Sequence, residues 1–127
     1  MKKTIINTTS APAPIGPYSQ AVIANGMLFL SGQIGIDSTS GALAAHEIKA
    51  ETKQVMENIK SILNAAGLDF TDVIKCSIFI MDMNNFAAIN EVYGSYFTGD
   101  FPARETVQVA RLPKDANVEI SVIAAAK

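Results

Sequence analysis

Hydrophobic runs in the first third of the chain predict three β-strands. The predicted strands cover residues 4–7, 20–24 and 27–31. The dipeptide Asn25-Gly26 separates the last two and is typical of a two-residue hairpin turn. Every position from Met27 to Leu30 is apolar, as expected for a strand that is covered on both faces. The Pro-rich residues 10–17 are predicted to form an ordered loop that leads into this hairpin.

Apolar residues at helical spacing then predict an α-helix from about Glu47 to Ala66. The stripe on one side of this predicted helix consists of Ile48, Thr52, Val55, Ile59, Ile62, Leu63 and Ala66. Gly67 then stands where a left-handed cap would end the helix. A shorter stripe predicts a second helix that Asn84 or Asn85 caps and that ends at Gly99. Its apolar positions are Phe86, Ile89, Tyr93 and Phe97.

Three further strands are predicted over residues 73–81, 104–110 and 118–125. The first would place Ile74, Cys76, Ile78 and Ile80 on one face, and Val73, Lys75, Ser77, Phe79 and Met81 on the other. In the second, Arg104, Thr106 and Gln108 share a face; in the third, Glu119 and Ser121 lie opposite Val118, Ile120 and Val122. The order strands, helix, strand, helix, strands predicts an α+β fold with two helices on one face of a sheet.

Two helices leave the other face of such a sheet uncovered. That face would display Val73, Phe79, Met81 and Ile123 among polar groups. A monomer rarely exposes so large an apolar patch, so we predict a symmetric homo-oligomer. Small-molecule pockets often form at the seams of such assemblies.

Composition narrows the class of protein. The 127 residues suit one domain, residues 1–127, and 49% of them are hydrophobic, which excludes a disordered chain. No apolar run approaches the roughly 20 residues of a membrane span, and no signal peptide is expected. A net charge of −2 without a basic block argues against nucleic-acid binding. One cysteine and one histidine cannot form a structural zinc site, and one cysteine cannot form an intrachain disulfide. We therefore expect no metal, no cofactor and a reducing compartment, the cytoplasm.

Arg104 and Glu119 are the candidates for chemistry. A guanidinium at the head of a strand can bind a carboxylate through two hydrogen bonds, and Glu119 can transfer protons. Patterning alone leaves two alternatives open for each residue. Arg104 is either a surface arginine after a proline or a residue at a cleft, and Glu119 lies either on a solvated face or in a site.

Other candidates are weaker. Tyr18 lies between a rigid turn and a strand, where a packed ring with a solvated hydroxyl is the alternative interpretation. Gly32, beside Ser31, permits close approach of a ligand or another chain. His46 is expected at the exposed start of the first helix, and Cys76 is expected to pack as a small hydrophobic residue.

Several segments together resemble the Rid (YjgF/YER/UK) family and its RidA subgroup. They run from Ile15 to Ala21, from Phe29 to Ile34, from Pro102 to Arg104, and from Val109 to Ile120. Residues 52–59 and 90–93 fit the same pattern, so the resemblance spans nearly the whole chain. It implies a chorismate-mutase-like mixed sheet with two helices on one face, a homotrimer and three pockets between subunits.

The resemblance also implies an activity. Members hydrolyse reactive enamines and imines, such as 2-aminoacrylate and 2-aminocrotonate, to 2-keto acids and ammonia. By this resemblance Arg104 binds the substrate carboxylate, Glu119 serves the attacking water and Tyr18 orients the site. Ser31, Gly32 and Asn90 match positions around the pocket.

Thr106 is a departure from the family pattern, because many members carry a cysteine at this position. Chemistry that depends on that thiol is therefore not expected here, although the main chain of Thr106 can still contact a ligand. Imine hydrolysis needs no enzyme nucleophile. Two alternatives remain open: a binder or sensor of short 2-keto acids without catalysis, and an endoribonuclease, against which the net acidic charge argues.

Overall fold

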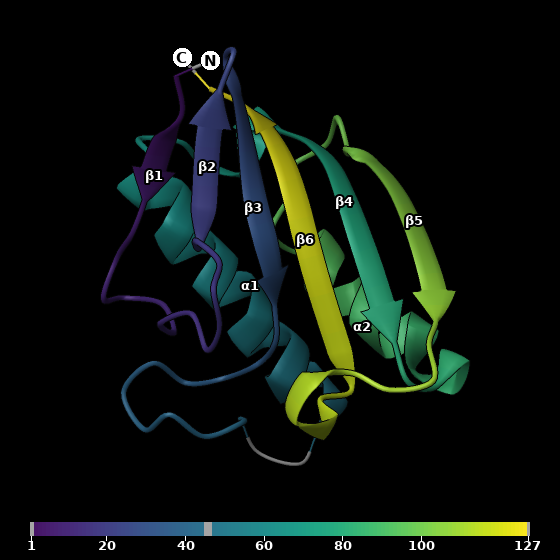
Figure 1. Cartoon of the computed structure of the whole chain (residues 1–127). Helices are drawn as coiled ribbons and strands as arrows, with labels where there is room; N and C mark the ends of the chain where they lie inside the picture. The colour runs from purple at the N-terminus through teal and green to yellow at the C-terminus, as the bar shows by residue number, and fades with distance from the viewer. Residues whose placement is uncertain (1, 45–46, 127) are drawn as a thin grey trace.

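A computed structural model describes residues 2–44 and 47–126, which form one mixed sheet of six strands with two α-helices packed on one face (Figure 1). His46 lies outside the described residues. The strands are β1 (Thr4–Ile6), β2 (Ala21–Ala24), β3 (Met27–Gln33), β4 (Val73–Ile80), β5 (Ala103–Gln108) and β6 (Val118–Ala125). The helices are α1 (Ile48–Ala65) and α2 (Phe86–Gly94), with short 3-10 turns at Phe70–Asp72, Met83–Asn85 and Pro113–Asp115. The predicted α+β class is confirmed. No helix in these ranges is long and apolar enough to cross a membrane.

The strand order is β1-β2-β3-β6-β4-β5, and only β4 and β5 pair in parallel. A parallel pair needs a crossover, and α2 supplies it between these two strands. The last strand, β6, enters the middle of the sheet between β3 and β4. Residues far apart in the sequence therefore meet along β6.

Local sequence signals set the turns and helix ends that were predicted. Asn25 and Gly26 have φ values of 51° and 71°, which fit the two-residue hairpin turn between β2 and β3. At the start of α1 the Glu47 carboxylate accepts hydrogen bonds from the amides of Lys49 and Ala50. At its end Gly67 adopts a φ of 75°, and the amides of residues 67 and 68 donate to the carbonyls of residues 64 and 63, a Schellman cap.

The second helix differs from its prediction. It ends at Gly94 rather than at Gly99, because Tyr96 and Phe97 continue in tighter turns with bonds to the residue three positions back. Neither asparagine caps through its side chain. The Asp82 carboxylate instead accepts from the Asn84 amide and begins a 3-10 turn that leads into α2.

The main core lies between the sheet and the helices. The largest fully buried apolar side chains come from β3, β4, β6, α1 and α2: Leu28, Val55, Met56, Ile59, Ile62, Leu63, Ile78, Ile80, Ile89, Val118 and Ile120. The residues of β4 lie on the faces of the sheet that the sequence predicts, except at the start of the strand. Val73 is buried and Ile74 is 45% exposed, because the pairing with β6 shifts register between Val73 and Lys75. A bulge of this kind reverses the alternation of side chains on one side of it.

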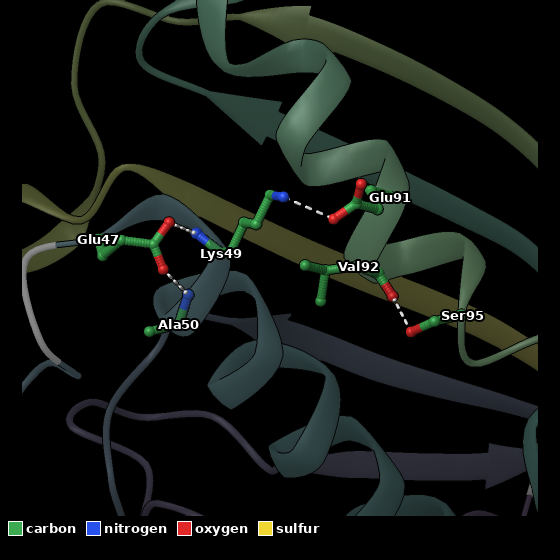
Figure 2. A network of polar contacts seen from close by, with 6 residues as sticks. All are labelled: Glu47, Lys49, Ala50, Glu91, Val92 and Ser95. Atoms are coloured by element: carbon green, nitrogen blue, oxygen red, sulfur yellow. Dashed lines mark hydrogen bonds and ion pairs between the residues drawn. The ribbon is translucent and has the colours of Figure 1, made fainter.

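An exposed ion pair joins the two helices, and each helix has a polar contact at one of its own ends nearby (Figure 2). The Lys49 ammonium lies 2.6 Å from the Glu91 carboxylate and so joins α1 to α2. The Ser95 hydroxyl donates to the Val92 carbonyl at the end of α2. Since both charged side chains are solvated, the ion pair contributes little beside the apolar core.

The sheet face away from the helices remains open in the single chain. An apolar band crosses it through paired residues of successive strands: Ile5, Val22, Phe29 and Ile123. Phe29 and Val107 are 48% and 41% exposed. Of the residues predicted on this face, Phe79, Met81 and Ile123 are partly exposed, whereas Val73 belongs to the core. Phe79 and Met81 also pack against a small second cluster of buried residues: Ile34, Ile36, Leu112 and Ala116.

Candidate active site

A bulge in β3 brings the Glu119 carboxyl against the main chain of Gly32. Leu30 pairs with Val122 and Gln33 pairs with Ile120, so one extra residue is accommodated between them. A Cβ atom at Gly32 would lie 2.8 Å from Cδ of Glu119, closer than non-bonded carbons approach. Glycine is therefore required here for close packing with the carboxyl.

Glu119 is half-buried, and burial raises the pKa of its carboxyl above the ordinary value. Desolvation disfavours the charged form, and within residues 2–44 and 47–126 no hydrogen bond to this carboxyl offsets that cost. A carboxyl in this state can accept and return a proton more readily than a fully solvated one.

A cleft of about 390 Å³ lies beside this carboxyl on the open face of the sheet. Tyr18, Ser31 and Gly32 line it with Glu119, so the structure brings four of the predicted site residues together. The Ser31 hydroxyl donates its hydrogen to the Ser19 carbonyl at 2.6 Å. The remaining wall is largely apolar: Pro12, Ile15, Ile34, Ile36 and Pro113.

Arg104 lies on the helix-facing side of edge strand β5. Its Nη1 donates to the Asn90 Oδ1 atom at 2.7 Å. The guanidinium carbon also lies 5.1 Å from the Tyr93 ring centroid and 5.6 Å from that of Phe86. Two aromatic faces and an amide thus hold the guanidinium in place, in a second hollow of about 350 Å³.

Within one chain, Arg104 and Glu119 lie on opposite faces of the sheet. Arg104 pairs with Cys76 and Glu119 pairs with Phe79, and these two residues of β4 are three positions apart. Side chains alternate along a strand, so an odd separation places them on opposite faces. The two candidate residues therefore do not share a pocket within a single chain.

Thr106 follows Arg104 on the same face. Its hydroxyl oxygen is buried and has no hydrogen-bond partner among the described residues. The Tyr93 hydroxyl is also buried, and the thiol of Cys76, a weak hydrogen-bonding group, lies beside it. Burial is the main cause that raises the pKa of Tyr93, and the Cys76 thiol nearby adds to it. Burial likewise raises the pKa of Cys76, so this thiol packs as a neutral group, as predicted.

Sequence reasoning missed the residues that support the site. Phe86 and Tyr93 were assigned only to a helix stripe, although their rings also contact the Arg104 guanidinium. Gln20 and Asn58 are buried polar side chains within otherwise apolar stretches of sequence. Their position in those stretches could have indicated that they form hydrogen bonds inside the fold. Among the described residues, no group of three or more His, Cys, Asp or Glu side chains could hold a metal ion.

Comparison with known proteins gives one consistent family. The sequence model of the family described as Endoribonuclease L-PSP matches residues 8–126. A RutC family protein of Pyrococcus horikoshii is 53% identical over 122 residues, which cover 96% of this chain and 97% of that protein. The 2-iminobutanoate/2-iminopropanoate deaminase of Homo sapiens is 46% identical over 122 residues, covering 96% of this chain and 89% of the human protein.

Solved structures agree with these relatives. Escherichia coli TdcF with bound serine superimposes with a TM-score of 0.93 at 45% identity, covering 98% of this chain and 99% of TdcF. YyfA of Yersinia pestis, described as a Rid family protein of unknown function, gives a TM-score of 0.95 at 47% identity, with 98% and 99% coverage.

Proposed function

Since this chain belongs to the Endoribonuclease L-PSP family, which includes the Rid (YjgF) proteins, we propose that it hydrolyses short 2-imino acids to 2-keto acids and ammonia. Relatives at about half identity carry the name 2-iminobutanoate/2-iminopropanoate deaminase. The observation that carries the proposal is a half-buried Glu119 carboxyl with a raised pKa at the end of a cleft that suits a small molecule.

The proposed site is shared by two copies of the chain. Arg104 and Glu119 face opposite sides of the sheet, so one small substrate cannot contact both within one chain. The open face of one copy, with its exposed Phe29 and Val107, would pack against the edge strand β5 of the next copy. A face-to-edge contact of this kind is heterologous, and in the homotrimer that the family implies it would close into a ring of three copies.

In the proposed mechanism, the Arg104 guanidinium binds the substrate carboxylate through two hydrogen bonds. Asn90, Phe86 and Tyr93 hold it in that orientation, so Asn90 would act through Arg104. Tyr18, Ser31 and Gly32 would line the cleft around the imine. The main chain of Thr106, near Arg104, would complete the carboxylate side of the site.

Glu119 would handle the protons. Its ionised carboxylate takes a proton from water as the oxygen attacks the carbon of the protonated imine, which gives a neutral tetrahedral carbinolamine. The protonated carboxyl then returns its proton to the nitrogen. As the C–N bond breaks, the regenerated carboxylate takes the proton of the carbinolamine hydroxyl, so that the 2-keto acid forms, and it passes this proton to the departing ammonia. No electron acceptor is needed, and the raised pKa suits a group that cycles between both forms.

A small imino acid is the proposed partner, and the cytoplasm is the proposed location, where the buried Cys76 thiol would stay reduced. Nucleic acid is not a proposed partner, given the net charge of −2.

The test generates 2-aminocrotonate with a threonine dehydratase and measures the rate of 2-ketobutyrate formation. The wild-type chain should accelerate it, and Arg104→Ala should lower kcat/KM about 100-fold, as expected for loss of about 3 kcal/mol of charge-assisted hydrogen bonding. Arg104→Lys should not restore it, because an ammonium lacks the planar fork. Binding of 2-ketobutyrate without any acceleration would instead identify a sensor.

A further inference from the structure

Gln20 is the most heavily bonded buried polar side chain beside the cleft. It is only 2% exposed and stands at the entrance to β2. Its Oε1 atom accepts from the Thr8 amide at 2.8 Å. Its Nε2 atom donates to the carbonyls of Thr8 and Pro12 at 3.0 and 2.9 Å, with a longer contact of 3.4 Å to Ala11.

These bonds replace the pairing that the preceding loop lacks. Residues 7–20 connect β1 to β2 without forming a strand, and the three prolines among them have no amide to donate. The Gln20 side-chain amide forms hydrogen bonds with the main-chain amide and carbonyl of Thr8, as a neighbouring strand would do. At the other end of the loop, the Ser31 hydroxyl donates to the Ser19 carbonyl.

The loop held in this way forms one wall of the cleft. It contributes Pro12, Ile15 and Tyr18, and Ile15 is 61% exposed at the rim. An exposed isoleucine beside a tyrosine offers apolar surface to the side chain of a bound molecule. Loose loops contribute less to affinity, because binding must then order them.

We propose that Gln20 is a positioning residue that fixes the Thr8–Ser19 loop, so that Ile15 and Tyr18 form a rigid apolar wall against the substrate side chain. This inference rests on the proposed function and assigns a role to a residue that touches no reacting atom. Because a rigid wall binds the ground state and the transition state alike, Gln20 acts on KM and leaves kcat nearly unchanged.

The principal variant is Gln20→Met, which keeps the length of the side chain and removes its hydrogen bonds. The expected result is a fivefold to tenfold rise in KM, and in the Kd of 2-ketobutyrate, roughly the cost of ordering one or two loop side chains. The matched control is Thr52→Val, which removes a buried hydrogen bond from Thr52 to the Ile48 carbonyl inside α1. The control should lose thermal stability and keep the wild-type KM.

Amide hydrogen exchange tests the tether without relying on catalysis. In the wild-type chain the Thr8 amide should exchange at least about 100-fold more slowly than an unprotected amide, and Gln20→Met should remove that protection. An unprotected Thr8 amide in the wild-type chain overturns the proposal, even if Gln20→Met does not fold. A rise in KM for Thr52→Val equal to that for Gln20→Met overturns it too, since a general loss of stability would then explain both.

The two levels of inference can fail separately. A wild-type chain that neither binds 2-ketobutyrate nor hydrolyses the imine refutes the proposed function, and with it the substrate role of the wall. Normal hydrolysis by Gln20→Met with an unchanged KM refutes the role of Gln20 and leaves the proposed function intact.

Discussion

Mixing two inactive variants distinguishes a site within one chain from a site shared between copies. Arg104→Ala keeps the cleft with Glu119, and Glu119→Gln keeps the edge strand with Arg104 and its partner Asn90. Because Arg104 and Glu119 lie on opposite faces of the sheet, each variant damages a different side of the proposed seam. A mixed assembly therefore contains an intact seam wherever the undamaged faces of two different variants meet.

The expected recovery follows from counting arrangements in a ring of three. With equal amounts and random exchange, about three quarters of the trimers are mixed, and each mixed trimer has one intact site out of three. The mixture should therefore reach about a quarter of wild-type activity, whereas each variant alone stays near background. Subunits are exchanged by joint unfolding and refolding, and the rate of 2-ketobutyrate formation is measured on the trimer fraction.

A matched control uses two variants damaged on the same side. Arg104→Ala mixed with Asn90→Leu should recover nothing, because Asn90 and Arg104 contact each other and belong to the same half of the seam. If Arg104→Ala and Glu119→Gln form mixed trimers that remain at background, the shared site is refuted. Recovery equal to that of the control pair leads to the same conclusion.

Four further predictions concern Glu119, Gly32 and Tyr93, which lie on or near the two faces. Glu119→Gln should lower kcat by about 100-fold or more with little change in KM. In the wild-type chain kcat should rise with pH through the raised pKa of Glu119, and this rise should be absent from the variant. Equal losses in kcat and affinity would indicate a binding role. Since this folded-state pKa is raised, wild-type stability should fall as pH rises from the ordinary glutamate pKa through the raised one, and denaturant titrations of Glu119→Gln should lack that slope. Gly32→Ala should fold normally but lose about tenfold in kcat. The new Cβ would lie 2.8 Å from Cδ of Glu119 and would displace the flexible end of that side chain. A wild-type kcat in this variant would show that the position of the carboxyl is unimportant. Tyr93→Phe should leave the free energy of unfolding unchanged or raise it by up to about 1 kcal/mol, since it keeps the ring beside Arg104 and removes a buried hydroxyl whose neighbour, the Cys76 thiol, is a weak hydrogen-bonding group. A loss of about 2 kcal/mol or more, on the scale expected for a well-satisfied buried hydroxyl, would contradict this.

Sequence patterns determined the features that depend on neighbouring residues. Asn25-Gly26 specified the hairpin, because few other residue pairs tolerate two positive φ values. The stripe on α1 and the cap at Gly67 set that helix within about one residue, and the alternation from Val118 to Ala125 gave β6 with its observed bounds. Long motifs such as the one from Ile15 to Ala21 were also sufficient to indicate the family.

Tertiary structure decided which residues meet. The sequence placed Arg104 and Glu119 on adjacent predicted strands, but β4 lies between β5 and β6, and its pairing turns the two side chains to opposite faces. The bulges at Val73 and Gly32, and the bonds from Gln20 to Thr8, likewise depend on segments distant in the chain. Periodicity reflects the local geometry of the backbone, whereas register and pairing arise from long-range contacts that no short stretch of sequence encodes.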